Sequence, residues 1–437
     1  MAGVDRKTVC LMVVLAGASQ AQNAGPVGLS LRQAIDVALK QSPQIQITKL
    51  RALQAESSVK AVRSGLFPQL SVGASSGYEN LNLKALGFMA PGLPENTGPL
   101  RQFDLRPSLN QTIYDPGLRK ALLASRERAE ESRWNSVSMQ ESILLAVTGF
   151  YLEALDYGAR IEAGSARLGS AEAWLEQVRH FVEAGTASRL DQSRAGIQVD
   201  NERRALVEFR SGLAIKKLLL ANLLGLPADT ELELTESFAP PLPGAVPLDV
   251  TLSKALEGRP EMRAAQARLR AAIADKQKAQ SGRYPVVGVT TDFGRMGNAV
   301  WSNLFTYTVR GTVRLPILQG GRVEAEVSSS DAVVRQINEE IRGIKLQIES
   351  DVHTALIERN AAEEAYEWAA DATTLAQKSL ELATDRFEAG LASNIEVVNA
   401  QEVLASAQSA AIRCVFDYHI ARARLAKAQG NIRDLFE

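Results

Sequence analysis

The strongest hydrophobic pattern in the chain is helical and runs through two long tracts. Apolar residues recur there every three or four positions, as expected for one face of an α-helix. The two stripes comprise Ile143, Val147, Phe150 and Ala154, and then Ile341, Ile344, Ile348, Val352 and Ala355. No proline occurs between residues 117 and 226 or between 317 and 437, and good helix formers dominate both tracts. Each tract is therefore predicted to be almost wholly helical.

Each helical tract has one break, and the two breaks are alike. Gly185 and Gly390 are candidate left-handed caps that end a helix. Ser188 and Ser393, three residues further on, are candidate N-caps of a returning helix. We therefore expect two helical hairpins, over residues 117–225 and 320–430. The 66 residues from Arg119 to Ala184 would span roughly 100 Å as a helix, so these hairpins must pack against neighbours.

A pattern of period two precedes each helical tract. Apolar positions alternate with polar ones near residues 69–79 and 102–114, and again near 286–294 and 304–316. We expect four strands of about ten residues, paired as two hairpins, with no other β-structure in the chain. This length matches a tilted strand that crosses a bilayer.

Alternation alone also fits a half-buried sheet of a soluble protein. Four strands, however, leave two open edges, and a bilayer does not tolerate an unpaired edge. We therefore expect the sheet to close with strands from other copies of the chain. Tyr78, Phe88, Trp301 and Phe305 lie near the hairpin ends and would suit an aromatic girdle, although loop packing explains them equally well.

The chain reads as a tandem duplication. Leu31, Ile35, Ala38, Leu39 and Pro43 recur 217 residues later as Leu248, Leu252, Ala255, Leu256 and Pro260. Three further short sequence motifs follow in the same order in both copies. These are Ser-Gly-x-Phe/Tyr-Pro at 64–68 and 281–285, Gly-x-Arg at 117–119 and 320–322, and Glu-Ala-Gly-x-Ala-Ser at 183–188 and 388–393. The predicted units are a first repeat, 29–226, a proline-rich linker, 227–245, and a second repeat, 246–432.

The first 21 residues have the form of a secretory signal. Arg6 and Lys7 precede a short apolar stretch, and small residues end at Ala21. Cleavage there would remove Cys10, so we expect export without a lipid anchor. No later stretch has the roughly 18 apolar residues of a membrane-spanning helix. Any membrane span is expected to use strands.

Composition excludes several classes of function. The formal net charge of -1 gives no basic field for binding nucleic acid, and the two cysteines cannot build a disulfide framework. His180, His353 and His419 lack His or Cys partners at metal-ligand spacing. The sequence also lacks phosphate-loop, nucleophile-elbow and dinucleotide motifs. We therefore predict no enzyme activity, no catalytic residue, no metal and no cofactor.

The duplicated motifs together resemble the TolC-type outer membrane efflux proteins, over about residues 29–432. The resemblance implies a mainly α fold with a β-barrel part. In a homotrimer, twelve strands would close one barrel in the outer membrane, and the duplicated helical hairpins would form an α-barrel in the periplasm. It also implies an exit duct for a tripartite efflux or type I secretion system, with a periplasmic adaptor and an inner-membrane pump as partners.

The resemblance also implies sites. It places adaptor docking at the hairpin tips, at Gly185, Ala187, Ser188, Gly390, Ala392 and Ser393. It places a periplasmic constriction near Glu396 and Asn399, with Asp191 at the matching position of the first repeat. Three Glu396 carboxylates in one bore would attract cations, whereas both acids also suit an ordinary first helical turn. Ala392 stands where some members carry an arginine latch.

One rival stays open on the sequence alone. An elongated periplasmic scaffold without channel activity would also need long helices and an export signal. It would not need four strands that each have one face suited to lipid and the other suited to water. Drugs, metals and proteins remain alternative cargoes, because we expect the pump to select the substrate.

Overall fold

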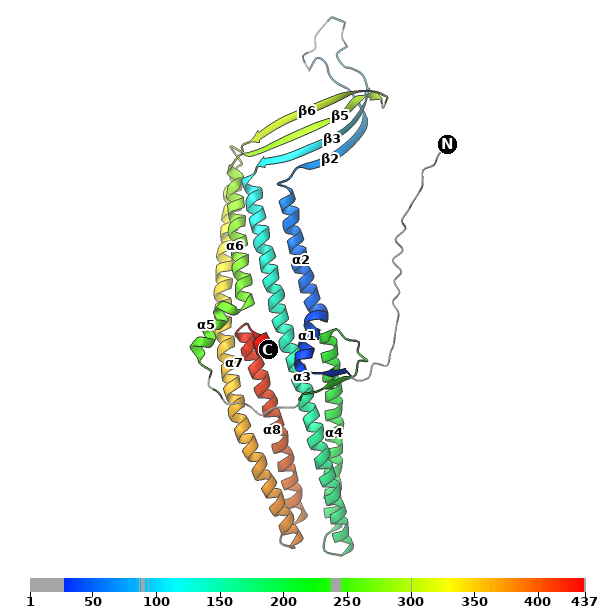
Figure 1. The fold of residues 1–437 in the computed structure, drawn as a ribbon, viewed down its shortest axis with the longest axis vertical. Helices are drawn as coiled ribbons and strands as arrows, with labels where there is room; N and C mark the ends of the chain where they lie inside the picture. The colour runs from blue at the N-terminus through cyan, green and yellow to red at the C-terminus, as the bar shows by residue number, and fades with distance from the viewer. Residues whose placement is uncertain are drawn as a thin grey trace, which may run out of the picture.

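The computed structural model describes residues 27–85, 87, 91–92, 94–236, 244, 246–299 and 301–435. The predicted signal segment 1–21, Phe88, and residues 237–243 and 245 of the proline-rich linker lie outside these residues. The described chain is elongated, with a curved sheet at one end, long helices running away from it, and two helical turns at the far end (Figure 1).

Both halves of the chain follow one order of elements. The first has α1 (Leu31–Gln41), α2 (Pro43–Ser64), β2 (Gln69–Glu79), β3 (Leu100–Tyr114), α3 (Pro116–Glu183) and α4 (Arg189–Leu224). The second has α5 (Leu248–Gly258), α6 (Pro260–Gln280), β5 (Val286–Ala299), β6 (Ser302–Arg314), α7 (Arg322–Glu388) and α8 (Asn394–Ala428). The short elements are β1 (Val27–Leu29), β4 (Leu232–Leu234), η1 (Ser281–Arg283) and η2 (Ile432–Leu435).

The helices begin where the sequence supplies start signals. Pro43, Pro116 and Pro260 each occupy the first helical turn, where a missing N–H costs nothing. Asp115 caps α3, because its carboxylate accepts the Leu118 N–H at 2.9 Å. The resulting α3 and α7 have 68 and 67 residues. No helix in the described part of the chain has an apolar stretch that could cross a membrane.

The four strands form one antiparallel sheet in the order β2-β3-β5-β6. β2 and β3 form one hairpin, β5 and β6 form the other, and β3 pairs with β5 at the junction of the two repeats. β3 and β5 extend beyond their predicted bounds, to 15 and 14 residues, whereas β6 keeps the predicted 13 residues but starts two residues earlier. β6 also ends at Arg314, before the predicted Pro316, which has no N–H for the ladder.

The expectation of no further β-structure was wrong. β1 and β4 form a parallel two-stranded sheet halfway along the helices, and β4 lies within the predicted linker (Figure 1). Three-residue strands are too short to show a period, so the sequence pattern could not reveal them. They cover a core whose most buried members include Ile45, Leu144, Tyr151, Leu220, Leu224 and Ile432. The Tyr151 hydroxyl donates to the Leu29 carbonyl at 2.9 Å.

Candidate functional site

The two helical tips have the same backbone turn. Gly185 and Gly390 have φ of 77° and 70°, as predicted for left-handed caps. In the first tip, the Thr186 N–H bonds to the Phe181 carbonyl at 2.8 Å and the Gly185 N–H to Val182 at 3.1 Å. The second tip repeats this pair of bonds from Leu391 to Arg386 and from Gly390 to Phe387. Both turns are therefore Schellman motifs set by the glycines.

The tip residues beside the glycines differ in exposure. Ala187 and Ala392 are half-buried, whereas Ser188 and Ser393 are exposed. Leu391 is exposed at the second tip, where the first tip has Thr186. The tips therefore present two similar turns that carry different side chains.

The returning helices are capped differently. Ser188 and Asp191 form a capping box: the Asp191 N–H donates to the Ser188 hydroxyl at 3.2 Å, and the Ser188 N–H donates to the Asp191 carboxylate at 3.0 Å. Ser393 occupies the same position in α8, but its side chain makes no cap bond. The Asp191 carboxylate is thus engaged in its own helix start.

Glu396, at the position that matches Asp191, reaches outward instead. Its carboxylate lies 3.8 Å from the guanidinium of Arg386 on α7, and both side chains are exposed. Asn399 is also exposed, one turn further along α8. Glu396 and Asn399 therefore share an accessible stretch of α8, and Asp191 belongs to the cap on α4.

The sequence did not reveal a buried seam that joins the two hairpins just above the tips. Asn394, only 1% exposed, accepts the indole N–H of Trp174 at 2.9 Å and donates to the Asp191 carbonyl at 2.9 Å. Trp174 meets the ring of Phe387 edge-on, with 5.1 Å between ring centroids. One asparagine thus connects α8 to both helices of the first hairpin. Its residue type after a serine looks like ordinary cap chemistry, so only the packed structure shows its partners.

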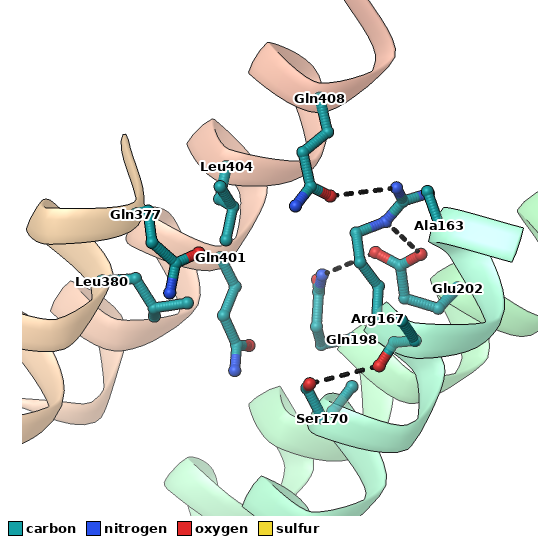
Figure 2. Close-up of a pocket in the computed structure, with 12 residues that line it drawn as sticks. Ala163, Arg167, Ser170, Gln198, Glu202, Gln377, Leu380, Gln401, Leu404 and Gln408 are labelled. Carbon is teal, nitrogen blue, oxygen red and sulfur yellow. Dashed lines mark hydrogen bonds and ion pairs between the residues drawn. The ribbon is translucent and has the colours of Figure 1, made fainter. Parts of the chain in front are cut away.

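A polar cavity of about 210 Å³ lies above this seam, between the hairpins. Figure 2 shows Arg167 of α3 between Glu202 of α4 and Gln408 of α8. Arg167 pairs with Glu202 at 3.1 Å and donates to Gln408 at 3.4 Å, and both members of the ion pair are largely buried. The Oε1 atom of Gln401 is buried without a hydrogen-bond partner among the described residues. This layer adds a polar contact between the hairpins, next to the seam.

A buried acid and a half-buried one lie near each other in the middle of the molecule. Glu141 on α3 is 8% exposed and lies beside Ile432 of η2. Burial raises the pKa of Glu141, and the nearby Glu261 raises it further. Glu261 is itself held by Ser138 at 2.8 Å and by Arg259 at 3.3 Å. Among the residues that the structure describes, no group of three His, Cys, Asp or Glu side chains is placed to hold a metal ion.

The sheet is sorted into two faces by its register. Leu70 pairs with Leu109, Val287 with Val313, and Phe293 with Tyr307 on one face. On the other face, Ser71 pairs with Ser108 and Asp292 with Thr308. Many of the apolar side chains are exposed in a single chain, including Leu70, Val72, Tyr78, Phe305, Tyr307, Val309 and Val313. One face therefore suits a nonpolar surrounding and the other suits water.

Comparison with known proteins agrees with this geometry. The chain is 25% identical over 408 residues to the pyoverdine export outer membrane protein OpmQ of Pseudomonas putida KT2440, covering 92% of this chain and 85% of OpmQ. It is 25% identical over 419 residues to the probable efflux pump outer membrane protein TtgC of the same strain, covering 92% and 83%.

Solved structures share the fold. VceC of Vibrio cholerae superposes with a TM-score of 0.80 at 20% identity, covering 92% of this chain and 96% of VceC. CusC gives a TM-score of 0.80 at 17% identity, covering 94% and 96%. The sequence model of the outer membrane efflux protein family matches residues 34–226 and 251–431, one match in each repeat. The chain therefore belongs to the outer membrane efflux protein family.

Proposed function

We propose that three copies of this chain form an exit duct in the outer membrane for cargo delivered by an inner-membrane pump through a periplasmic adaptor. The observation that carries the proposal is the sorting of all four strands into one apolar and one polar face. A strand whose faces alternate in this way matches a wall between lipid and an aqueous lumen.

The open edges of the sheet support assembly with other copies. β2 and β6 each pair on one side only within the chain. Lipid cannot satisfy the free N–H and C=O groups of such edges, so β6 of one copy must pair with β2 of the next. The smallest outer membrane barrels have about eight strands, and three copies of this sheet supply twelve.

The long helices also carry apolar positions that a single chain leaves bare. Trp368, Leu375 and Leu382 of α7 are about two-thirds exposed and recur every seven residues. Leu190 and Ile197 of α4 are exposed at the same spacing. Heptad spacing is the signature of one helix packing along another. A neighbouring copy that covers these stripes would continue the strand barrel as a helical tunnel.

The tips are the surfaces that the proposal assigns to the adaptor. They lie at the end of the molecule farthest from the sheet (Figure 1), so a sheet in the outer membrane would direct them toward the inner membrane. The relatives OpmQ and TtgC are named for pyoverdine export and for an efflux pump. We accordingly propose small molecules as cargo, with the energy for transport supplied by the pump.

The test is to purify the mature protein in detergent, measure its mass by native mass spectrometry, and record its current in planar bilayers. The proposal expects a trimer that inserts and conducts. A monomer that remains in the soluble periplasmic fraction and never conducts would instead support the helical scaffold, the rival function.

A further inference from the structure

The polar face of the sheet carries a charged triad near the middle of the strands. Arg106 of β3 forms a bidentate ion pair with Asp104, two residues earlier. Its Nε donates to one carboxylate oxygen at 2.6 Å, and its Nη2 donates to the other. Its Nη1 donates to Asp292 of β5 at 3.2 Å. The triad therefore spans the junction between the first and second repeats.

The surrounding strands make room for this arginine. Gly73 of β2 pairs directly with Arg106, and Gly294 of β5 lies against it on the other side. A Cβ on Gly294 would collide with the Leu105 carbonyl and with the Arg106 side chain. The β3–β5 ladder also has no paired residues at Arg106 and Pro107, since proline has no N–H to offer. The guanidinium thus lies across β5 in a space that only glycine leaves open.

The triad keeps a net charge of -1, because one guanidinium faces two carboxylates. Its side chains remain 29%, 18% and 23% exposed for Arg106, Asp104 and Asp292. Most neighbours on the polar face are small or carry hydroxyl groups, such as Ser75 and Thr308. The carboxylates can therefore act on ions that pass over this face.

We propose that Asp104, Arg106 and Asp292 set the ion selectivity of the membrane part of the channel. The inference rests on the proposed function, in which the polar face lines the lumen. Threefold assembly would then place three triads at one level of the bore. Asp292 is the group most available to a passing cation, because a single longer bond holds it, whereas both oxygens of Asp104 are engaged.

The test compares reversal potentials of single channels across a KCl gradient. Arg106→Gln removes three positive charges per trimer, and the K⁺ to Cl⁻ permeability ratio should rise about twofold or more. Asp292→Asn should lower the ratio by a similar factor. Arg106→Lys keeps the charge but loses the bidentate geometry of the guanidinium, and its permeability ratio should stay near the parent value.

Arg101→Gln is the matched control. Arg101 lies on β3 but pairs with Tyr78, on the opposite face of the sheet, and its loss should not move the reversal potential. Should Arg106→Gln fail to assemble, Asp292→Asn tests the same charge in the opposite direction, because it leaves the Asp104 pair intact.

Two results would overturn the inference, and they are distinguishable. If Arg106→Gln and Asp292→Asn channels both conduct normally and keep the reversal potential of the parent, the triad only holds β3 and β5 together and does not set ion selectivity. A parent protein that neither forms trimers nor conducts would remove the proposed function and this inference with it.

Discussion

At the scale of single residues, the structure separates side chains that serve packing from those that face solvent. Asn394 and Asn399 lie on one helix, yet Asn394 is buried between the hairpins and Asn399 is exposed. Asp191 and Glu396 occupy matching positions of the two repeats, yet only Asp191 is engaged in a cap. The first pair shares its residue type and the second its position after the tip glycine, and in both pairs the two members have different surroundings.

Asn394→Ala should destabilise the seam by about 1–3 kcal/mol, because the Trp174 N–H and the Asp191 carbonyl would lose their buried partner. Thermal unfolding of the detergent-solubilised protein measures this loss. Asn399→Ala is the control and should change stability by less than about 0.5 kcal/mol. Equal effects of the two changes would show that the seam bonds contribute nothing.

Glu141 should make stability fall as pH rises. Its pKa is raised in the folded state, so the folded protein keeps a proton that the unfolded chain releases. The free energy of unfolding therefore decreases from the ordinary glutamate pKa up to the raised value, and stays lower above it. Glu141→Gln should remove this loss and give a higher melting temperature than the parent at pH 8.

Below the ordinary glutamate pKa, the advantage of Glu141→Gln should disappear, because both forms are then neutral. Melting temperatures across the pH range measure the trend. Exposed Glu364 offers the control, and Glu364→Gln should follow the parent throughout. A constant offset of Glu141→Gln at every pH would point to packing and not to titration.

At the scale of elements, the turns are governed by glycine conformation. A Cβ added to Gly185 or Gly390 would meet nothing within 4 Å, so the cost of substitution is in the backbone alone. A left-handed residue with a Cβ is disfavoured by roughly 1–2 kcal/mol, and more for a β-branched side chain. The tips are therefore free of packing constraints but depend on their φ angles.

Replacing Gly185 and Gly390 by valine should reshape both tips while trimers remain in the membrane. Adaptor-dependent export should then weaken, as measured by cargo efflux from cells and by binding of purified adaptor. Gly196→Ala, two turns inside α4 with open space around it, is the control and should leave export unchanged. Full export with both tip glycines replaced would contradict docking at the tips.

At the scale of the whole molecule, threefold assembly would turn exposed groups into rings. Glu396 is accessible in the chain and pairs only loosely with Arg386, at 3.8 Å. Three such carboxylates near the axis would repel one another and attract multivalent cations. Asp191 has its carboxylate engaged in the α4 cap and serves as the paired comparison.

Glu396→Gln should therefore reduce divalent-cation block of single-channel current, and block by a divalent chloride salt on the periplasmic side measures it. Asp191→Asn should leave the block unchanged, because the Asp191 carboxylate is held in the capping box by its Oδ2 atom. If Glu396→Gln channels block like the parent, Glu396 does not line the constriction and is an ordinary acid of the first helical turn.

The sequence by itself determined the features that depend on local chemistry and on repetition. Helical spacing, the absence of proline, and the glycines at 185 and 390 specified the two hairpins, and alternation specified the four strands. These patterns suffice because helix and strand periods are properties of neighbouring residues. The duplication supplied the order of elements in both halves.

The tertiary structure alone decided which distant residues meet. It paired β1 with β4 across some 200 residues, buried Asn394 against Trp174, and brought Arg106 of one repeat to Asp292 of the other. It also gave the Asp191 and Glu396 side chains different partners, although their positions match. Such contacts depend on the register and packing of whole elements, which no local period encodes, and for that reason the sequence could not supply them.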